Sequence, residues 1–126
     1  MHRRKGAAGR ADDLFSKLVR SRGFCEGPGT RKGAAVIHTQ NLQCAHILGR
    51  RLNLIRTDLD NALCLCAGCH YYFTNRPEEW RVFIDEKFGA EHWYGLYRKA
   101  HVSPAPKVDW KAEVERLTAL LAEVER

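Results

Sequence analysis

The chain has 126 residues, 44% of them hydrophobic and 29% charged, which is the composition of one small globular domain and excludes a wholly disordered chain. No apolar stretch approaches the roughly 20 residues that cross a bilayer, and no apolar run follows the basic start, so we expect a cytoplasmic protein with no membrane partner. The net charge of +6 lies in the first half, where residues 1–60 hold 12 Lys and Arg against 5 Asp and Glu. An excess of positive charge in one half of a chain is typical of a protein that contacts nucleic acid, and equally of one whose surface charge keeps it soluble.

The first half predicts an arm, a helix and a hairpin. Residues 1–11 are basic and rich in Gly and Ala, so we expect a flexible arm. Asp12 can cap a helix that carries its apolar side chains on one face and ends at Gly23. The apolar runs 34–37 and 42–48, separated by polar residues, predict the two strands of a hairpin, followed by a loop.

The second half predicts helices. A short apolar segment precedes a helix over residues 68–74, and Asn75 with Pro77 is a typical start for the next helix, which Gly89 ends. A further helix is expected over residues 91–100, and then a linker over 101–108.

The tail, residues 109–126, has an apolar seam at alternating steps of four and three, formed by Trp110, Val114, Leu117, Leu121 and Val124. About two heptads are too short to be stable alone. We therefore expect an amphipathic helix that forms a homodimer or docks on a partner, such as a phage packaging or recombination protein.

The cysteines favour a metal site. A disulfide framework is not expected in a reducing compartment, and no βαβ alternation surrounds Cys66 and Cys69 as it would in a thioredoxin-like redox site. Two thiols at this spacing are typical of zinc ligands, and His70 follows them at once.

Three features follow one another along the chain: Cys44-Ala45-His46, then Asn61, then the C-x-x-C-H run that ends at His70. With them, the stretch LQCAHILGRRLNLIRTDLDNALCLCAGCHYYFTNRPEEW, residues 42–80, resembles the HNH endonuclease family, specifically its small phage-type members. His46, Asn61 and His70 stand at the name-giving positions. The resemblance covers about a third of the chain closely and residues 20–100 loosely.

The resemblance implies an α+β fold with a zinc-stabilised ββα-metal core, treble-clef-like, within a nuclease domain over residues 12–100. A core of this size needs a structural Zn²⁺, because burial alone stabilises it too little. The expected ligands are Cys25, Cys66, Cys69 and a fourth, for which Cys44 is the first choice and His38 the second. Cys64, or a site with no fourth protein ligand, is the remaining alternative. The fourth is open because Pro28 stands where the family has a second cysteine. Cys64 is expected to be a small buried hydrophobe.

The resemblance also implies roles for the three name-giving residues. His46 would be the general base that deprotonates water, and His70 would bind a catalytic divalent ion, Mg²⁺, Mn²⁺ or Ni²⁺. Asn61 would orient His46. Without the motif, each residue has a plainer interpretation: a satisfied core histidine, an exposed histidine and a turn residue.

One position departs from the family. Ala45 stands where many members have a further metal ligand, and Asp58, Asp60 and Thr74 are the candidates to replace it. Near the histidines, the guanidinium groups of Arg50, Arg51 and Arg56 are expected to hold phosphates, unless they are only a solvated loop surface.

The sequence thus predicts a metal-dependent HNH endonuclease, phage-encoded and active in a bacterial host cell, that nicks or cleaves double-stranded DNA. The alternative is a zinc-stabilised DNA-binding module that has lost catalysis and acts within a larger phage DNA-processing complex. Ala45 is the residue that favours this alternative.

Overall fold

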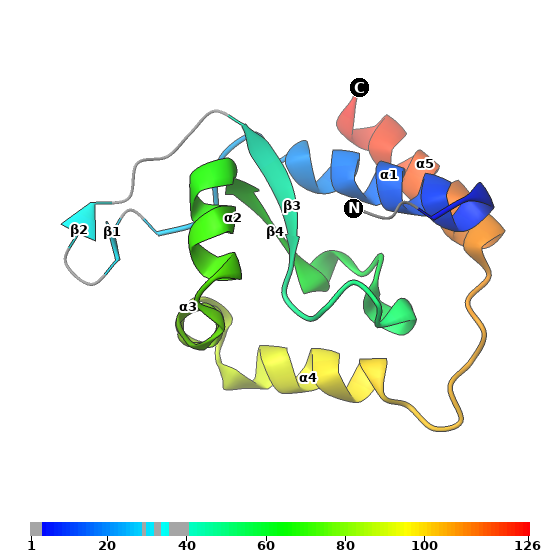
Figure 1. Ribbon diagram of the computed structural model, residues 1–126. Coiled ribbons are helices and arrows are strands. Elements are labelled where there is room, and N and C mark those ends of the chain that lie inside the picture. Colours follow the sequence, from blue (N-terminus) through cyan, green and yellow to red (C-terminus); the bar gives the residue numbers. More distant parts are fainter. Residues whose placement is uncertain (1–3, 29, 32–33, 36–40) are drawn as a thin grey trace.

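The structure is a computed structural model that describes residues 4–28, 30–31, 34–35 and 41–126. Within these ranges the fold is α+β, with five α-helices and two small antiparallel sheets (Figure 1). The elements in chain order are α1 (Gly6–Arg20), β1 (Thr30–Arg31), β2 (Ala34–Ala35), β3 (Leu42–His46), β4 (Ala62–Cys66), α2 (Ala67–Thr74), α3 (Pro77–Phe88), α4 (Ala90–Ala100) and α5 (Trp110–Val124). Two 3-10 turns, Asn53–Ile55 and Leu59–Asn61, lie between β3 and β4. None of the described helices is long and apolar enough to cross a membrane.

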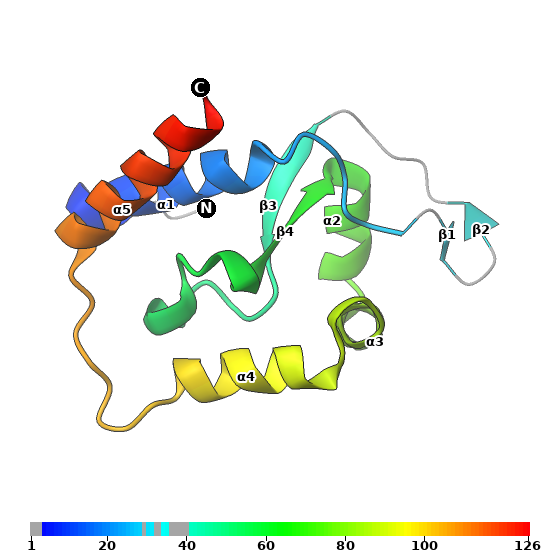
Figure 2. The same cartoon turned by 180° about the vertical axis from the view of Figure 1, so that it is seen from behind.

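The sheet β3–β4 is the centre of the fold. Its register runs from Leu42 opposite Cys66 to His46 opposite Ala62, and every residue of β4 is buried. Side chains alternate along a strand, so β4 contributes to a core on each of its two faces. Helix α2 lies on one face, and α1 with α5 lies on the other (Figures 1 and 2).

The predicted hairpin partner of β3 is wrong. The strand at residues 42–46 pairs with β4, which follows a connection of 15 residues, whereas β2 pairs with β1. The reason is burial: the segment over residues 62–66 is apolar enough to be covered on both faces, so it makes the better partner for the central strand. Residues 36 and 37 of the predicted first strand lie outside the described residues.

Helix α1 begins at Gly6, earlier than the predicted start at Asp12. The run Ala7–Ala8 favours helix, and the Asp12 side chain does not cap the helix, because it accepts hydrogen bonds from Arg4 and Arg56 instead. Most of the predicted arm over residues 1–11 is therefore helical. Residues 1–3 lie outside the described part of the chain.

Helices α2, α3 and α4 follow the sequence prediction closely. Pro77 stands at the start of α3, and Gly89 ends it with a φ of 89°, a backbone conformation that favours glycine. Helix α5 begins after Asp109, whose side chain accepts from the backbone N–H of Ala112 at 3.1 Å.

The apolar seam of α5 packs within its own chain. Leu117 and Leu121 are buried against Ala11, Phe15 and other residues of α1, so the two terminal helices form one layer over the sheet. The seam was expected to dimerise or to dock on a partner, but most of it is covered by α1. Only Val124, at the end of the seam, remains 52% exposed.

This packing makes a prediction for stability. Leu117→Ala should lower the free energy of unfolding by about 2–5 kcal/mol, because it opens a cavity in a fully buried contact. Val124→Ala, at the exposed end of the same seam, should change it by no more than about 0.5 kcal/mol. Urea unfolding of both variants measures the difference. Equal effects would show that α5 does not pack on α1 in solution.

Candidate functional site

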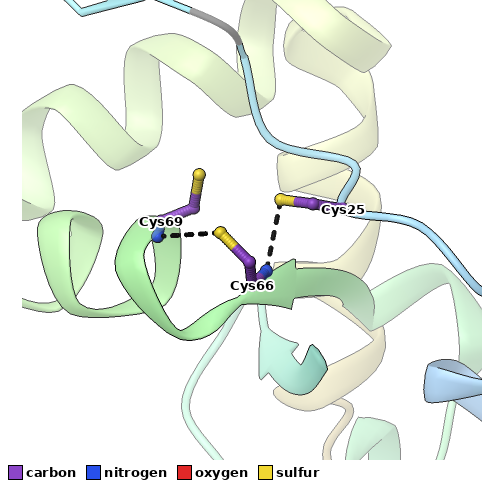
Figure 3. A group of neighbouring side chains, drawn as sticks. All are labelled: Cys25, Cys66 and Cys69. Atoms are coloured by element: carbon purple, nitrogen blue, oxygen red, sulfur yellow. Dashed lines mark hydrogen bonds between the residues drawn. The ribbon is translucent and has the colours of Figure 1, made fainter. Parts of the chain in front are cut away.

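Three cysteines come together from separate elements (Figure 3). Cys25 lies in the loop after α1, Cys66 is the last residue of β4, and Cys69 lies in the first turn of α2. Their sulfur atoms all lie within 4.8 Å of one another. This grouping of thiols is suited to a thiophilic metal ion, and the three residues could hold one.

Backbone geometry around the sulfur atoms fits a metal site. The Cys25 sulfur accepts from the N–H groups of Cys66 at 3.2 Å and Gly27 at 3.4 Å, and the Cys66 sulfur accepts from the N–H of Cys69 at 3.4 Å. N–H donors stabilise thiolates. At Gly27 an added Cβ would lie 2.9 Å from the Cys69 sulfur, so only glycine lets this turn approach so closely. Burial and the neighbouring sulfur atoms raise the pKa of Cys69 to about 12, which favours the protonated thiol. A bound cation would favour the thiolate instead.

The loop that carries Cys25 is held against the outer edge of β4. The Glu26 N–H donates to the Cys64 carbonyl at 2.7 Å, and the Glu26 carboxylate accepts from the Cys64 N–H at 2.8 Å. The same carboxylate pairs with Arg22 at 2.8 Å. Cys25 is thereby placed beside the end of the strand that carries Cys66.

Cys44, expected as the fourth ligand, is not brought to this group. It pairs with Cys64 across the sheet, and both side chains contact the α1–α5 core, on the other face from Leu65. Burial raises the pKa of Cys44 to about 12, consistent with a protonated thiol. The prediction that Cys64 is a buried hydrophobe is confirmed, since it is fully buried in this core. His38 lies outside the described residues.

His46, the last residue of β3, has one ring nitrogen fixed by the backbone. Its Nε2 lies 2.9 Å from the Arg56 carbonyl oxygen, which only accepts, so the proton lies on Nε2. The other nitrogen, Nδ1, is buried and has no hydrogen-bond partner among the described residues. A neutral imidazole held in this tautomer offers the lone pair of Nδ1 to a proton.

Asn61 holds the loop that supplies this carbonyl. The side chain is fully buried, and both its oxygen and its N–H groups bond to the loop. Its Oδ1 accepts from the Leu48 N–H at 2.8 Å, and its Nδ2 donates to the carbonyls of Leu48 at 3.2 Å and Ile55 at 3.1 Å. Because Ile55 precedes Arg56, these bonds fix the loop next to the carbonyl that contacts His46.

The surroundings of His46 favour its neutral form. Burial lowers its pKa below the ordinary value, and the nearby charges of Arg50 and Arg56 lower it further, against the opposite effects of the Arg56 carbonyl and Asp12. The ring of Phe15, from α1, packs on the imidazole with its centroid at 5.4 Å. Helix α1, outside the motif, thus forms one wall of the histidine environment.

His70 lies on α2, one residue after the third cysteine. Its Nδ1 lies 2.7 Å from the side-chain oxygen of Gln43 on β3. Burial, and then the charge of Arg50, lower its pKa. A cavity of about 250 Å³ has His46 and His70 in its lining, together with Ala45 and Thr74.

The candidates to replace the ligand missing at Ala45 contribute little. The Thr74 hydroxyl lines the cavity but donates to the His70 carbonyl at 2.7 Å. Asp58 pairs with Lys99 and lines a different cavity with Asp60, between the loop and α5. Among the described residues predicted to bind the catalytic ion, His70 is therefore the one that still offers a ligand atom there, a ring nitrogen on α2.

The three arginines divide into two kinds. Arg56, expected to hold phosphates, is 9% exposed, and its guanidinium donates to both oxygens of Asp12, at 2.7 and 2.9 Å. That expectation is corrected: Arg56 ties the loop to α1. Burial would raise the pKa of Asp12, but hydrogen bonds from Arg56 and Arg4 lower it to about 2. Arg50 and Arg51 are exposed, and Arg50 lies close enough to affect both histidines.

Comparison of the chain with models of protein families, with curated proteins and with solved structures finds no match in any of the three. A proposal of function therefore depends on the arrangement of the side chains.

Sequence reasoning missed three residues around the histidines: Phe15 against the His46 ring, Asp12 on Arg56, and Gln43 on His70. The first two come from a helix that the motif does not include, so no local pattern pointed to them. Gln43 stands three residues before His46 in the same strand, and this position was the one signal in the sequence that could have indicated a role near the histidines.

The cysteine group makes a prediction. If the group holds zinc, Cys66→Ser should reduce it from about one ion per chain to none, and the cooperativity of unfolding should fall with it, because a bound structural ion stabilises a fold. Cys44→Ser, the matched control on the other face of the sheet, should retain the zinc. Metal analysis and thermal unfolding of both variants measure this. Zinc-free wild type, or retention of zinc by Cys66→Ser, would contradict the site.

Proposed function

We propose that the protein is a metal-dependent endonuclease of the HNH type, phage-encoded, which hydrolyses phosphodiester bonds of double-stranded DNA. The observation that carries the proposal is the state of His46. The Arg56 carbonyl accepts a hydrogen bond from its Nε2–H, Asn61 holds the loop in place, and Nδ1 keeps a lone pair with no described partner. A general base needs this combination of fixed orientation, neutral charge and a vacant nitrogen.

In the proposed reaction, His46 Nδ1 accepts a proton from water while the water oxygen attacks the phosphorus of the DNA backbone. A P–O bond forms to the water oxygen, and the P–O ester bond to the leaving deoxyribose oxygen breaks. The leaving oxygen takes a proton from solvent. A divalent ion, when bound at His70, would stabilise negative charge on the phosphate oxygens. His70 would hold that ion through the nitrogen that does not face Gln43.

The cysteine group supports the proposal in a second way. The sheet β3–β4 with α2 is a ββα unit, and the ββα-metal core of HNH enzymes has this order of elements, with zinc at cysteines like these. We propose Zn²⁺ at Cys25, Cys66 and Cys69 with a structural role. Its position at the junction of β4 and α2 would hold the helix of His70 against the sheet.

DNA would lie over the exposed arginines next to the histidines. Arg50 and Arg51 are carried by the loop that follows His46, and the charges of Arg50 and of Arg20, on α1, each act on the Cys44 thiol. Guanidinium groups in this position would contact phosphates without reading bases. We expect binding with little sequence specificity.

The alternative, an inactive DNA-binding module of a larger phage complex, also has specific support. Ala45 offers no ligand, the Thr74 hydroxyl is used by a backbone carbonyl, and Nδ1 of His46 is buried. An enzyme must let water reach Nδ1, whereas a binding module needs neither that access nor a catalytic ion.

His46→Ala separates the two candidates. Plasmid cleavage with Mg²⁺, Mn²⁺ or Ni²⁺ should fall by about 10²–10⁴-fold, while bound zinc and DNA affinity stay as in the wild type. Since the base acts when neutral and its pKa is lowered, wild-type activity should rise with pH through a midpoint below the ordinary histidine value of 6.5. Undiminished cleavage by His46→Ala would show that the base is wrong. DNA binding without cleavage under every metal would favour the inactive module.

The arginines make a separate prediction. Removing two charges with Arg50→Gln and Arg51→Gln should weaken binding to all duplexes alike and reduce the slope of log K against log salt by about 1 per arginine. Arg98→Gln with Arg126→Gln removes the same charge from α4 and the end of the chain, and should leave the slope nearly unchanged. Fluorescence anisotropy at several salt concentrations measures both. Equal slopes for the two double variants would place the phosphate contacts elsewhere.

A further inference from the structure

Gln43 connects the central sheet to the helix of His70. It lies on β3 opposite Leu65, and its side chain is half-buried. Its amide oxygen Oε1 lies 2.7 Å from Nδ1 of His70, a residue 27 positions away in sequence. This is a direct contact between two elements that each carry one of the predicted active-site histidines.

The chemistry of the contact fixes the ring. An amide oxygen only accepts hydrogen bonds, so His70 must donate, and its proton must lie on Nδ1. Nε2 then has the lone pair, and no hydrogen bond reaches it within the part of the chain that the structure describes. We propose that Gln43 is a positioning residue: it selects the tautomer of His70 and turns Nε2 toward a divalent cation. The inference rests on the proposed function and deepens it.

The contact matters here because the rest of the cation site is sparse. The cavity beside His70 is lined by Ala45, which has no donor atom, and by Thr74, whose hydroxyl bonds to the His70 carbonyl. A single imidazole ligand that rotates or changes tautomer would bind an ion weakly. An acceptor on Nδ1 prevents both changes and makes Nε2 more basic, as such partners do for metal-bound histidines elsewhere.

The tautomer is tested without any cleavage assay. Long-range ¹H–¹⁵N spectra of the full chain should show His70 with a protonated Nδ1 and an unprotonated Nε2. Gln43→Leu, which has no acceptor, should lose this preference, and Gln43→Glu, which keeps an acceptor oxygen, should retain it. Asn41→Leu, the same loss of an amide just before the strand, is the control and should leave His70 unchanged. A wild-type His70 protonated on Nε2 would overturn the proposal, even if Gln43→Leu failed to fold.

Cation binding gives the second readout. Titration with Mn²⁺, followed by broadening of the His70 ring signals, should need about 10–100-fold more metal in Gln43→Leu than in the wild type, with recovery in Gln43→Glu. If cleavage occurs, the metal concentration for half-maximal rate should shift by the same factor, with a smaller effect on the rate at saturating metal. Unchanged Mn²⁺ affinity in Gln43→Leu would overturn the role of Gln43 and leave the nuclease proposal standing. A wild type that binds Mn²⁺ at His70 but never cleaves DNA would overturn the nuclease proposal and leave the role of Gln43 standing.

Discussion

Burial of β4 on both faces is the constraint on which the rest of the structure depends. All five residues of this strand, from Ala62 to Cys66, are buried, so the chain must supply an apolar layer on each side of a sheet of only two strands. Helices α2, α3 and α4 contribute the layer on one side, and α1 with α5 the other. The terminal helices are therefore part of the fold, because without them Cys64 and Ala62 would be exposed to water.

The same constraint determines where the histidines lie. His46 ends the strand beside β4 and faces Phe15 of α1, while His70 is carried by the helix that begins where β4 ends. The long connection between the strands is held by Asn61 from within and by the Arg56–Asp12 ion pair from α1. The loop can thus present its Arg56 carbonyl to His46 with little freedom. A cation among Cys25, Cys66 and Cys69 would fix the junction of strand and helix in the same way.

Local signals in the sequence predicted α3 from its proline and its final glycine, and α4 from its apolar positions. The C-x-x-C spacing and the resemblance to the HNH family predicted the grouping of Cys25, Cys66 and Cys69. The strand pairing was wrong because no turn signal marks a connection of 15 residues, and the apolar run 34–37 is nearer in sequence. Arg56 and Cys44 were misplaced for a related reason: the burial of a side chain depends on which distant helix covers it. The contacts of Asp12 and Gln43 join elements 44 and 27 residues apart, and no periodicity reports them.

The most direct test of the account is a crystal structure of the full chain with a short DNA duplex and Ca²⁺, which commonly binds in place of Mg²⁺ without supporting hydrolysis. The account predicts the DNA backbone over Arg50, a cation at Nε2 of His70, and a water molecule between Nδ1 of His46 and a phosphorus atom. Duplex bound on another face, with Nδ1 of His46 still buried beside Phe15, would contradict it.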